Sequence, residues 1–273
     1  MIHVGLTEGG FEGRVYYINP GSPAVHGQPT VASLTEIKEP VDLCYIMVGT
    51  DGALPVIHDT IAAGIHNAVV LAGGFAEQDE HDLSIIGPNC MGYINVVRST
   101  EAMATLSERP ILQESVALIS QSGVLGAMML NYAHTQGVGL SILVSTGNEA
   151  AISVTDALQY AVEDEATRAI ALFMETIREP EHFVQIARQA LKRGKPIVAL
   201  KAGRSEITAR VVLAHTGALT GDDRVNSIEK LIHTANVFAT IDPLPGRRLG
   251  VERCHGNGSR LPPRIGGSPM VKC

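Results

Sequence analysis

The sequence is poor in aromatic residues: it contains no tryptophan, and aromatic residues make up only 4% of its 273 positions. Hydrophobic residues still account for 45% of the chain, so its cores must be built mainly from Val, Ile, Leu, Ala and Met. No apolar run approaches the roughly 20 residues that a membrane-spanning helix needs, and the N-terminus lacks the charged and apolar regions of a signal peptide. We therefore expect a cytoplasmic protein that does not associate with membranes.

Basic residues are outnumbered by acidic ones, which gives a net charge of −7 and a pI of about 5.8. A nucleic-acid partner is therefore not expected, because phosphate-backbone binding needs a basic surface. The cysteines show no C-x-x-C spacing, so they favour free thiols in a reducing compartment over disulfides or a metal site. The four cysteines are Cys44, Cys90, Cys254 and Cys273.

Residues 1–113 have the pattern of an α/β unit in which strands alternate with helices, as in Rossmann-like folds. Two features suggest that this unit is incomplete. No G-x-G-x-x-G motif follows an opening strand, and the connection from Phe75 to Leu83 is too short for the usual crossover helix. The expected elements are strands at residues 14–18, 42–48, 68–71 and 83–86, and a helix at residues 54–65.

Residues 114–242 predict a second α/β unit with a flavodoxin-like, doubly wound parallel sheet. Residues 243–273 lack periodic apolar positions and are rich in Gly, Pro and Arg, which predicts an irregular tail. For the second unit we expect strands at residues 115–119, 140–144, 169–174, 196–200 and 237–241, with helices at about 123–136, 155–162, 180–192 and 226–234.

Three candidate groups follow strands of the second unit, and ligands of such sheets bind beyond the carboxyl ends of the strands. The turn Ser120–Gly123 opens a helix, whose free N–H groups and positive dipole end favour phosphate; alternatively, its serine is only an N-cap. Glu175 follows the third expected strand of this unit, where a carboxylate can orient an imidazole, although it can equally be a solvated loop acid. His215 stands among small residues downstream of Lys201 and Arg204, and a neutral imidazole is a nucleophile near neutral pH.

Five separated motifs together resemble the α part of the nucleoside-diphosphate-forming acyl-CoA synthetases, which include ADP-forming acetate–CoA ligase and, more distantly, succinyl-CoA synthetase. The resemblance covers roughly residues 9–241 and is strongest across 114–221. The motifs are Gly87–Gly92, Ser120–Gly123, Glu175 after an apolar strand, Lys201–Arg204 and Ala214–Ala218.

The resemblance implies a CoA-binding first domain and a phosphorylated His215 that takes phosphate from an acyl phosphate and passes it to ADP. Glu175 would stabilise the phosphohistidine, while Ser122, Gly123 and Gly217 would bind its phosphate. The positions that match the CoA- and thioester-forming site are Asn19, Pro20, Gly74, Phe75, Pro88 and Asn89.

The family pattern also opens with a strand and a Gly-rich turn that bind CoA, and we expect this chain to begin after them. The nucleotide-binding ATP-grasp part is not found in the sequence. The resemblance therefore implies an ATP-grasp β subunit as partner in a hetero-oligomer, with ATP or ADP and Mg²⁺ bound there, and a small carboxylic acid and CoA as substrates.

Three other functions are weighed against this one. A CoA- or nucleotide-binding regulatory module would keep the fold without catalysis. An NAD(P)-dependent dehydrogenase is disfavoured because G-x-G-x-x-G and its downstream acidic residue are absent. The fused relatives that carry a lysine acetyltransferase domain offer a third possibility, but residues 1–273 have no room for that domain.

Overall fold

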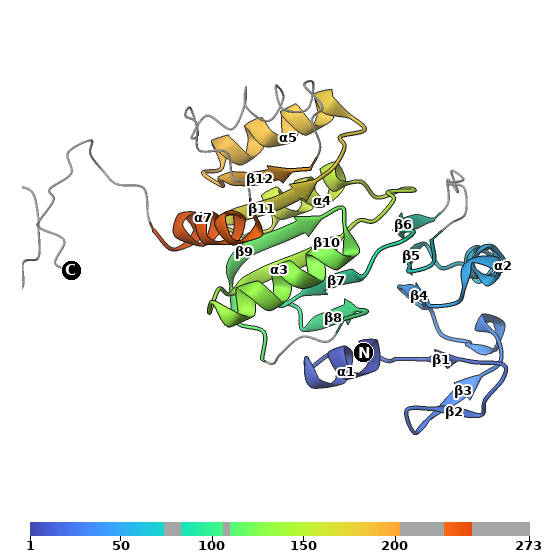
Figure 1. Ribbon diagram of the computed structural model, residues 1–273. Coiled ribbons are helices and arrows are strands. Elements are labelled where there is room, and N and C mark those ends of the chain that lie inside the picture. The colour runs from blue at the N-terminus through green and yellow to red at the C-terminus, as the bar shows by residue number, and fades with distance from the viewer. Residues whose placement is uncertain (74–82, 106–109, 203–226, 242–273) are drawn as a thin grey trace, which may run out of the picture. The chain divides into compact units, whose positions relative to one another are not determined.

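The computed structural model describes residues 1–73, 83–105, 110–202 and 227–241 (Figure 1). The chain divides into two compact units, Met1–Thr240 and Ile241–Cys273. Only Ile241 of the second unit is described, so the predicted tail at residues 243–273 lies outside the described residues. The fold below is that of the first unit.

Four adjacent parallel strands, starting from one edge, make up most of the larger sheet, whose order is β12-β11-β9-β10-β7-β8. All six residues of β11 are buried, as are the last five of β9, because helices cover both faces of the sheet. The four strands expected at residues 115–119, 140–144, 169–174 and 196–200 are confirmed. They are β9 (Gln113–Ser120), β10 (Leu140–Ser145), β11 (Ala169–Met174) and β12 (Ile197–Lys201).

Two helices cover each face of this sheet (Figure 1). Helices α3 (Gly123–Thr135) and α7 (Ile228–Thr240) enclose one hydrophobic core, and α4 (Val154–Glu163) and α5 (Pro180–Lys192) enclose the other. Local sequence explains where α4 begins, because Ser153 and Asp156 cap its first turn reciprocally. The predictions of α3, α4 and α5 are confirmed to within a few residues.

The prediction of a strand at residues 237–241 is wrong, because α7 continues to Thr240. Its buried residues are Leu231, Ile232, Ala235 and Ala239, a spacing that places them on one helical face. No Gly or Pro interrupts this stretch, so packing of that face extends the helix through a β-branched segment that reads locally as a strand. The described part of the sheet therefore has four parallel strands rather than the expected five.

Two strands that the sequence did not predict complete the larger sheet. β7 (Gly92–Asn95) pairs antiparallel with β10, and β8 (Thr100–Met103) pairs antiparallel with β7. Both fall within residues 1–113, which the sequence assigns to the first domain. Residues 92–103 thus extend the sheet of the second half, and they are followed by β9 at its centre.

A smaller parallel sheet has the order β4-β5-β6. Its strands are β4 (Cys44–Ile46), β5 (Asn67–Val70) and β6 (Ser84–Ile86), so the strands expected at 42–48, 68–71 and 83–86 are confirmed in shorter form. Helix α2 (Thr50–Ala62), which begins four residues before its predicted start, packs Ile57 into the core of this sheet.

The N-terminal residues differ most from the expectation. The strand predicted at residues 14–18 is reduced to β1 (Tyr17–Ile18), which lies in a separate three-stranded sheet with β3 and β2. The other elements here were not predicted: α1 (Ile2–Glu8), β2 (Ala24–Val25), β3 (Gln28–Val31) and the short 3-10 helix η1 (Leu34–Glu36). Among the described residues, every helix is too short or too polar to cross a membrane.

Candidate active site

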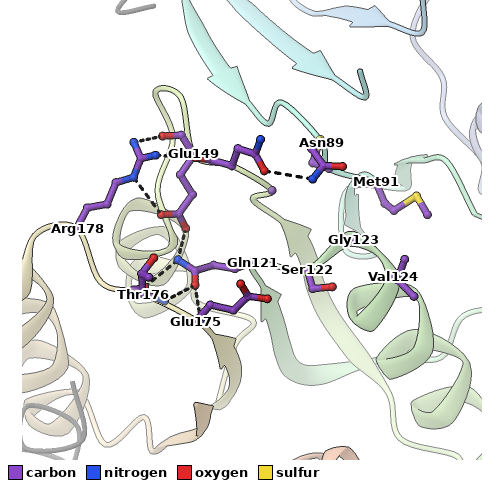
Figure 2. Close-up of a pocket in the computed structure, with 13 residues that line it drawn as sticks. Asn89, Met91, Gln121, Ser122, Gly123, Val124, Glu149, Glu175, Thr176 and Arg178 are labelled. Carbon is purple, nitrogen blue, oxygen red and sulfur yellow. Dashed lines mark hydrogen bonds and ion pairs between the residues drawn. The ribbon is translucent and has the colours of Figure 1, made fainter. Parts of the chain in front are cut away.

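A cleft of about 440 Å³ lies where β9, β10 and β11 end (Figure 2). It brings together four predicted site residues from three separate motifs: Asn89, Ser122, Gly123 and Glu175. In a parallel sheet the carboxyl ends of neighbouring strands share one edge, which explains this convergence. The other lining residues are Cys90, Met91, Gln121, Val124, Gly147, Asn148, Glu149, Thr176 and Arg178.

The first turn of α3 forms one wall of the cleft. Ser122 is the N-cap, and its Oγ accepts a hydrogen bond from the backbone N–H of Leu125. No described residue accepts a hydrogen bond from the backbone N–H of Gly123 or Val124. These two donors and the positive end of the helix dipole therefore offer a site for an anionic group.

Gly123 allows the chain around Met91 to approach this helix closely. A Cβ atom at Gly123 would lie 2.9 Å from Cγ of Met91 and 3.3 Å from its backbone nitrogen. A larger residue would push the loop after β6 away from the start of α3. The glycine is therefore needed for the walls of the cleft to meet.

The loop after β10 joins the opposite wall to the Pro88–Asn89 segment. The backbone N–H of Asn148 donates to the carbonyl oxygen of Pro88 at 2.8 Å, and Nδ2 of Asn89 donates to Oδ1 of Asn148 at 3.2 Å. Gly147 makes this approach possible: its φ is +64°, and an added Cβ would lie 2.3 Å from the Pro88 carbonyl oxygen. The smaller sheet thus contributes Asn89 to the cleft through main-chain contacts.

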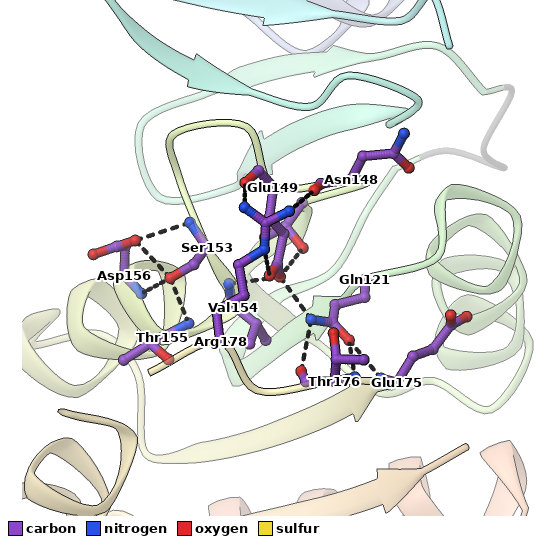
Figure 3. Close-up of polar contacts among 11 residues, drawn as sticks. Gln121, Asn148, Glu149, Ser153, Val154, Thr155, Asp156, Glu175, Thr176 and Arg178 are labelled. Atoms are coloured by element: carbon purple, nitrogen blue, oxygen red, sulfur yellow. Dashed lines mark hydrogen bonds and ion pairs between the residues drawn. The ribbon is translucent and has the colours of Figure 1, made fainter. Parts of the chain in front are cut away.

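Gln121 connects the loops that follow three adjacent strands (Figure 3). Its Nε2 donates to Oε1 of Glu149 at 2.8 Å and to the carbonyl oxygen of Thr176 at 2.9 Å. Its Oε1 accepts from the backbone N–H groups of Glu175 and Thr176. Since Gln121 is only 8% exposed, these bonds satisfy an amide that is shielded from water.

Glu149 is a buried carboxylate beside the cleft, only 3% exposed. Its Oε1 accepts hydrogen bonds from Gln121, from Oγ1 of Thr146 at 3.0 Å and from the backbone N–H of Val154 at 2.8 Å. Burial raises the pKa of this carboxyl group, and these hydrogen bonds partly oppose that increase. Nε of Arg178 lies 3.9 Å from Oε2 of Glu149. The other two guanidinium nitrogens of Arg178 donate to the backbone carbonyl oxygens of Asn148 and Glu149.

Glu175 itself is exposed. In both close-ups its side chain extends from the end of β11 toward the start of α3 (Figures 2 and 3). A hydrogen bond to Gln121 fixes the backbone of Glu175. The side chain of Glu175 lines the cleft, and its carboxylate faces into it. A carboxylate in this position can accept a proton or a hydrogen bond from a group that enters the cleft.

His215 and Gly217 lie outside the described residues, as do Gly74 and Phe75. The end of β12 is described, and there the backbone N–H of Ala202 donates to the carbonyl oxygen of Met174 at 2.9 Å. Met174 pairs with Lys201 and directly precedes Glu175. Ala202, the last described residue before His215, therefore lies beside the end of β11, next to Glu175.

Asn19 and Pro20 do not line this cleft. They follow β1 in the small N-terminal sheet, where Oδ1 of Asn19 accepts a hydrogen bond from the backbone N–H of Gly21 at 2.9 Å. Pro88, in contrast, is buried and contributes its backbone oxygen to the contact with Asn148.

Gln121, Asn148, Glu149 and Arg178, which make the polar contacts described above, were not among the predicted site residues. A signal existed for two of them, because Asn148 and Glu149 follow the buried strand β10 at the same sheet edge as the predicted groups. Arg178 gives no such signal, since its role depends on contacts with backbone carbonyl groups of another loop.

Comparison with known families matches both halves of the chain. Residues 6–96 match a CoA binding domain, and residues 113–242 match a succinyl-CoA ligase like flavodoxin domain. The two matches leave out only residues 1–5, 97–112 and 243–273. The protein is therefore of the class that joins a CoA-binding domain to a flavodoxin-like ligase domain.

Individual relatives agree with this assignment. The chain is 33% identical over 241 residues to the α subunit of ADP-forming acetate–CoA ligase I from Pyrococcus furiosus, covering 81% of this chain and 52% of that subunit. It is 29% identical over 265 residues to an ADP-forming 4-hydroxybutyrate–CoA ligase of Nitrosopumilus maritimus, covering 86% of this chain and 38% of the relative.

A solved structure shares both sequence and fold with this chain. It is acetyl-coenzyme A synthetase 1 of Ca. Korarchaeum cryptofilum, in complex with phosphate and ADP. It is 31% identical with a TM-score of 0.69, covering 86% of this chain and 52% of that one. The chain thus belongs to the NDP-forming acyl-CoA synthetase family, as its motifs predicted, and spans about half or less of the length of these relatives.

Proposed function

We propose that this chain is the α part of an NDP-forming acid–CoA ligase. The reaction would interconvert acyl-CoA, phosphate and ADP with a carboxylic acid, CoA and ATP, through a phosphate carried on His215. The observation that carries this proposal is the convergence of Asn89, the start of α3 and Glu175 along one cleft.

The chemistry proceeds in three balanced steps. Phosphate attacks the acyl carbon of the thioester, and the CoA thiolate leaves to give an acyl phosphate. An imidazole nitrogen of His215 then attacks the phosphorus, and the carboxylate of the free acid leaves. Finally, a phosphate oxygen of ADP attacks the phosphohistidine, which yields ATP and restores the imidazole.

The described residues are suited to the second step. The N–H groups of Gly123 and Val124 would bind the phosphate oxygens at the helix N-terminus, where the dipole favours negative charge. Glu175 would accept a hydrogen bond from the other imidazole nitrogen, which fixes the tautomer and supports the positive charge of the phosphorylated ring. Gly217 would bind the same phosphate from the histidine loop.

The first half of the chain would supply the binding site for CoA. The cleft volume lies within the range of small-molecule sites. Its lining includes the apolar side chains of Met91 and Val124 and the amide of Asn89. This composition suits the thiol-bearing end of CoA with its acyl group. Pro88 and Asn89 would contact that end, while Asn19, Pro20, Gly74 and Phe75 would contact other parts of CoA.

The nucleotide site would be contributed by a partner. The relatives are about twice as long as the stretch that this chain matches, or longer, and one of them is a separate α subunit. We therefore propose an ATP-grasp β subunit that binds Mg²⁺ with ATP or ADP, in a hetero-oligomer that works on a small carboxylic acid in the cytoplasm.

Phosphate labelling tests the proposal. The chain would be incubated with radiolabelled acetyl phosphate, and separately with radiolabelled Mg-ATP and the β subunit of an ADP-forming acetate–CoA ligase. We expect acid-labile, base-stable label that is lost completely in His215→Asn. The matched control is His233→Asn, because His233 is an exposed histidine on α7 that bonds to the hydroxyl of Tyr132.

Two results would overturn the proposal. Label that persists in His215→Asn would place the phosphate on another residue. A chain that binds CoA but takes up no label in either arm would instead be a regulatory binding module.

A further inference from the structure

We infer that Gln121 is a positioning residue, whose buried amide holds Glu175 where the proposed phosphohistidine chemistry needs it. This inference rests on the proposed function. Gln121 lies between the end of β9 and the N-cap of α3, yet its side chain reaches sideways to the loop that follows β11 (Figure 3). It contacts the main chain of Glu175 directly, while the Glu175 carboxylate remains available to the cleft.

Hydrogen-bond chemistry allows only one orientation of this amide. Oε1 must face the backbone N–H groups of Glu175 and Thr176, because both are donors. Nε2 must face the Thr176 carbonyl oxygen and the Glu149 carboxylate, because both are acceptors. A flipped amide would oppose like groups at all four contacts. The loop and the side chain therefore fix each other in one geometry.

Glu149 and Arg178 support that geometry from the far side. Glu149 accepts from Nε2 of Gln121, and Arg178 donates to the backbone carbonyl oxygens of Asn148 and Glu149. Asn148 in turn bonds to Asn89. A continuous series of hydrogen bonds thus connects Asn89, at the proposed acyl site, to the backbone of Glu175, at the proposed phosphate site.

A purely structural role for Gln121 would have different consequences. A structural amide would affect folding stability and leave the rate per folded molecule unchanged. A positioning residue changes the rate of phosphate transfer through Glu175, because misplacing a reacting group by about 1 Å can cost up to roughly 100-fold in rate. The two roles are separated by measuring rate and melting temperature on the same variants.

The test is a double-mutant cycle on the rate of His215 labelling by radiolabelled acetyl phosphate, or by the ATP and β-subunit arm. We expect Gln121→Met to lower the rate roughly 10- to 100-fold. In a Glu175→Gln background the same change should add less than about twofold, since coupled residues are not additive. The control is Gln159→Met, because the Gln159 amide bonds to Glu163 along its own helix and should leave the rate unchanged.

A second variant keeps the test valid if Gln121→Met does not fold. Gln121→Glu retains an acceptor for the Glu175 and Thr176 N–H groups but places a carboxylate oxygen 2.8 Å from Oε1 of Glu149. Its labelling rate relative to the wild type at the same pH should be lowest at neutral pH and rise as pH is lowered, when one proton is shared between the two carboxylates. A rate for this variant that matches the wild type across pH would overturn the inference.

The outcomes separate this inference from the proposed function. If the wild type takes up no label, the proposed function fails. Two results would leave the proposed function intact and rule out only the positioning role of Gln121. In both, the wild type is labelled and Glu175→Gln slows labelling. In the first, Gln121→Met has no effect on the rate; in the second, the rate losses of Gln121→Met and Glu175→Gln multiply independently in the double variant.

Discussion

The larger, mixed sheet and the smaller, parallel sheet of this molecule differ in depth of burial. β10 and β11 of the larger sheet have six residues each, and helices cover both of its faces. β4 and β6 of the smaller sheet have three residues each, and its core is packed by α2 and by Leu34 of the short 3-10 helix η1. Longer strands bury more apolar surface and share more hydrogen bonds. We therefore expect the smaller sheet to open at a lower free energy than the larger one.

The cleft lies where these two regions meet. Ser122, Gln121 and Glu175 follow strands of the larger sheet, whereas Asn89 follows the smaller one. The residues proposed to handle phosphate are thus anchored on the more deeply buried scaffold. Asn89, one of the residues proposed to contact CoA, is held by hydrogen bonds from its backbone N–H to Ala72 and from its side chain to Asn148, next to the contact between Pro88 and Asn148.

The strongest test of this comparison is a matched pair of leucine truncations. Leu118 on β9 is 1% exposed and Leu34 in η1 is 7% exposed. We expect Leu118→Ala to cost about 3–5 kcal/mol of unfolding free energy and Leu34→Ala about 2–3 kcal/mol, because the cost increases with the packing lost. Urea denaturation measures both changes. Equal costs, or a larger cost at Leu34, would show that the two regions do not differ as described.

A smaller effect is expected at the contact between the regions. Gly147→Ala places a methyl group 2.3 Å from the Pro88 oxygen in a residue whose φ is +64°. The matched control is Gly137→Ala, where φ is +65° and nothing lies within 4 Å of the added Cβ. Gly137→Ala should cost about 1 kcal/mol from backbone strain alone. Gly147→Ala should cost roughly 1–3 kcal/mol more, because a well-packed contact must rearrange.

That prediction also has a functional readout. If the Pro88 contact positions Asn89, then Gly147→Ala should weaken CoA binding by isothermal calorimetry, whereas Gly137→Ala should not. Equal stability losses in the two glycine variants would mean that the close approach to Pro88 does not stabilise the contact between the larger and the smaller sheet regions.

The same contrast explains which elements could be predicted from sequence. β9 to β12 are apolar runs bounded by turn residues, so they are visible without tertiary information. β7 and β8 have four residues each and include Asn95 and Glu101, which gives no strand pattern. The prediction fails at the end of α7 because Val237 to Ile241 favours a strand locally, while packing of Leu231, Ile232, Ala235 and Ala239 keeps the chain helical to Thr240.

The site was predictable to the extent that it depends on topology. Ser122 and Glu175 follow adjacent parallel strands, so their proximity follows from the fold class. The contacts of Gln121 depend on the register that pairs Ser120 with Phe173, which sequence periodicity does not supply. Asn19 and Pro20 were selected by resemblance, and they lie apart from the cleft residues in the described structure.

The smallest expected effects concern two glutamates whose pKa values move in opposite directions. In the first half, a hydrogen bond from Tyr16 and, next, one from Arg14 lower the pKa of the exposed Glu39. In the second half, burial raises the pKa of Glu149. Opposite shifts predict opposite pH dependences of stability.

The sign for Glu149 follows from proton binding. Because its folded pKa is above the unfolded value, the folded state binds more protons than the unfolded state between those two values. Its stabilising contribution is therefore complete below the ordinary glutamate pKa and is lost as pH rises through the raised one. For Glu39 the contribution is present above the ordinary pKa and is lost as pH falls through the lowered one.

Melting temperatures of the wild type, Glu149→Gln and Glu39→Gln across acidic to neutral pH test both signs. The wild type should lose stability relative to Glu149→Gln as pH rises above the ordinary glutamate range, because the amide oxygen can keep the hydrogen bonds without a buried charge. Relative to Glu39→Gln the wild type should gain slightly with pH, since exposed ion pairs contribute little. If both differences had the same sign, burial would not control the charge of Glu149, and its place in the more deeply buried half would have no electrostatic consequence.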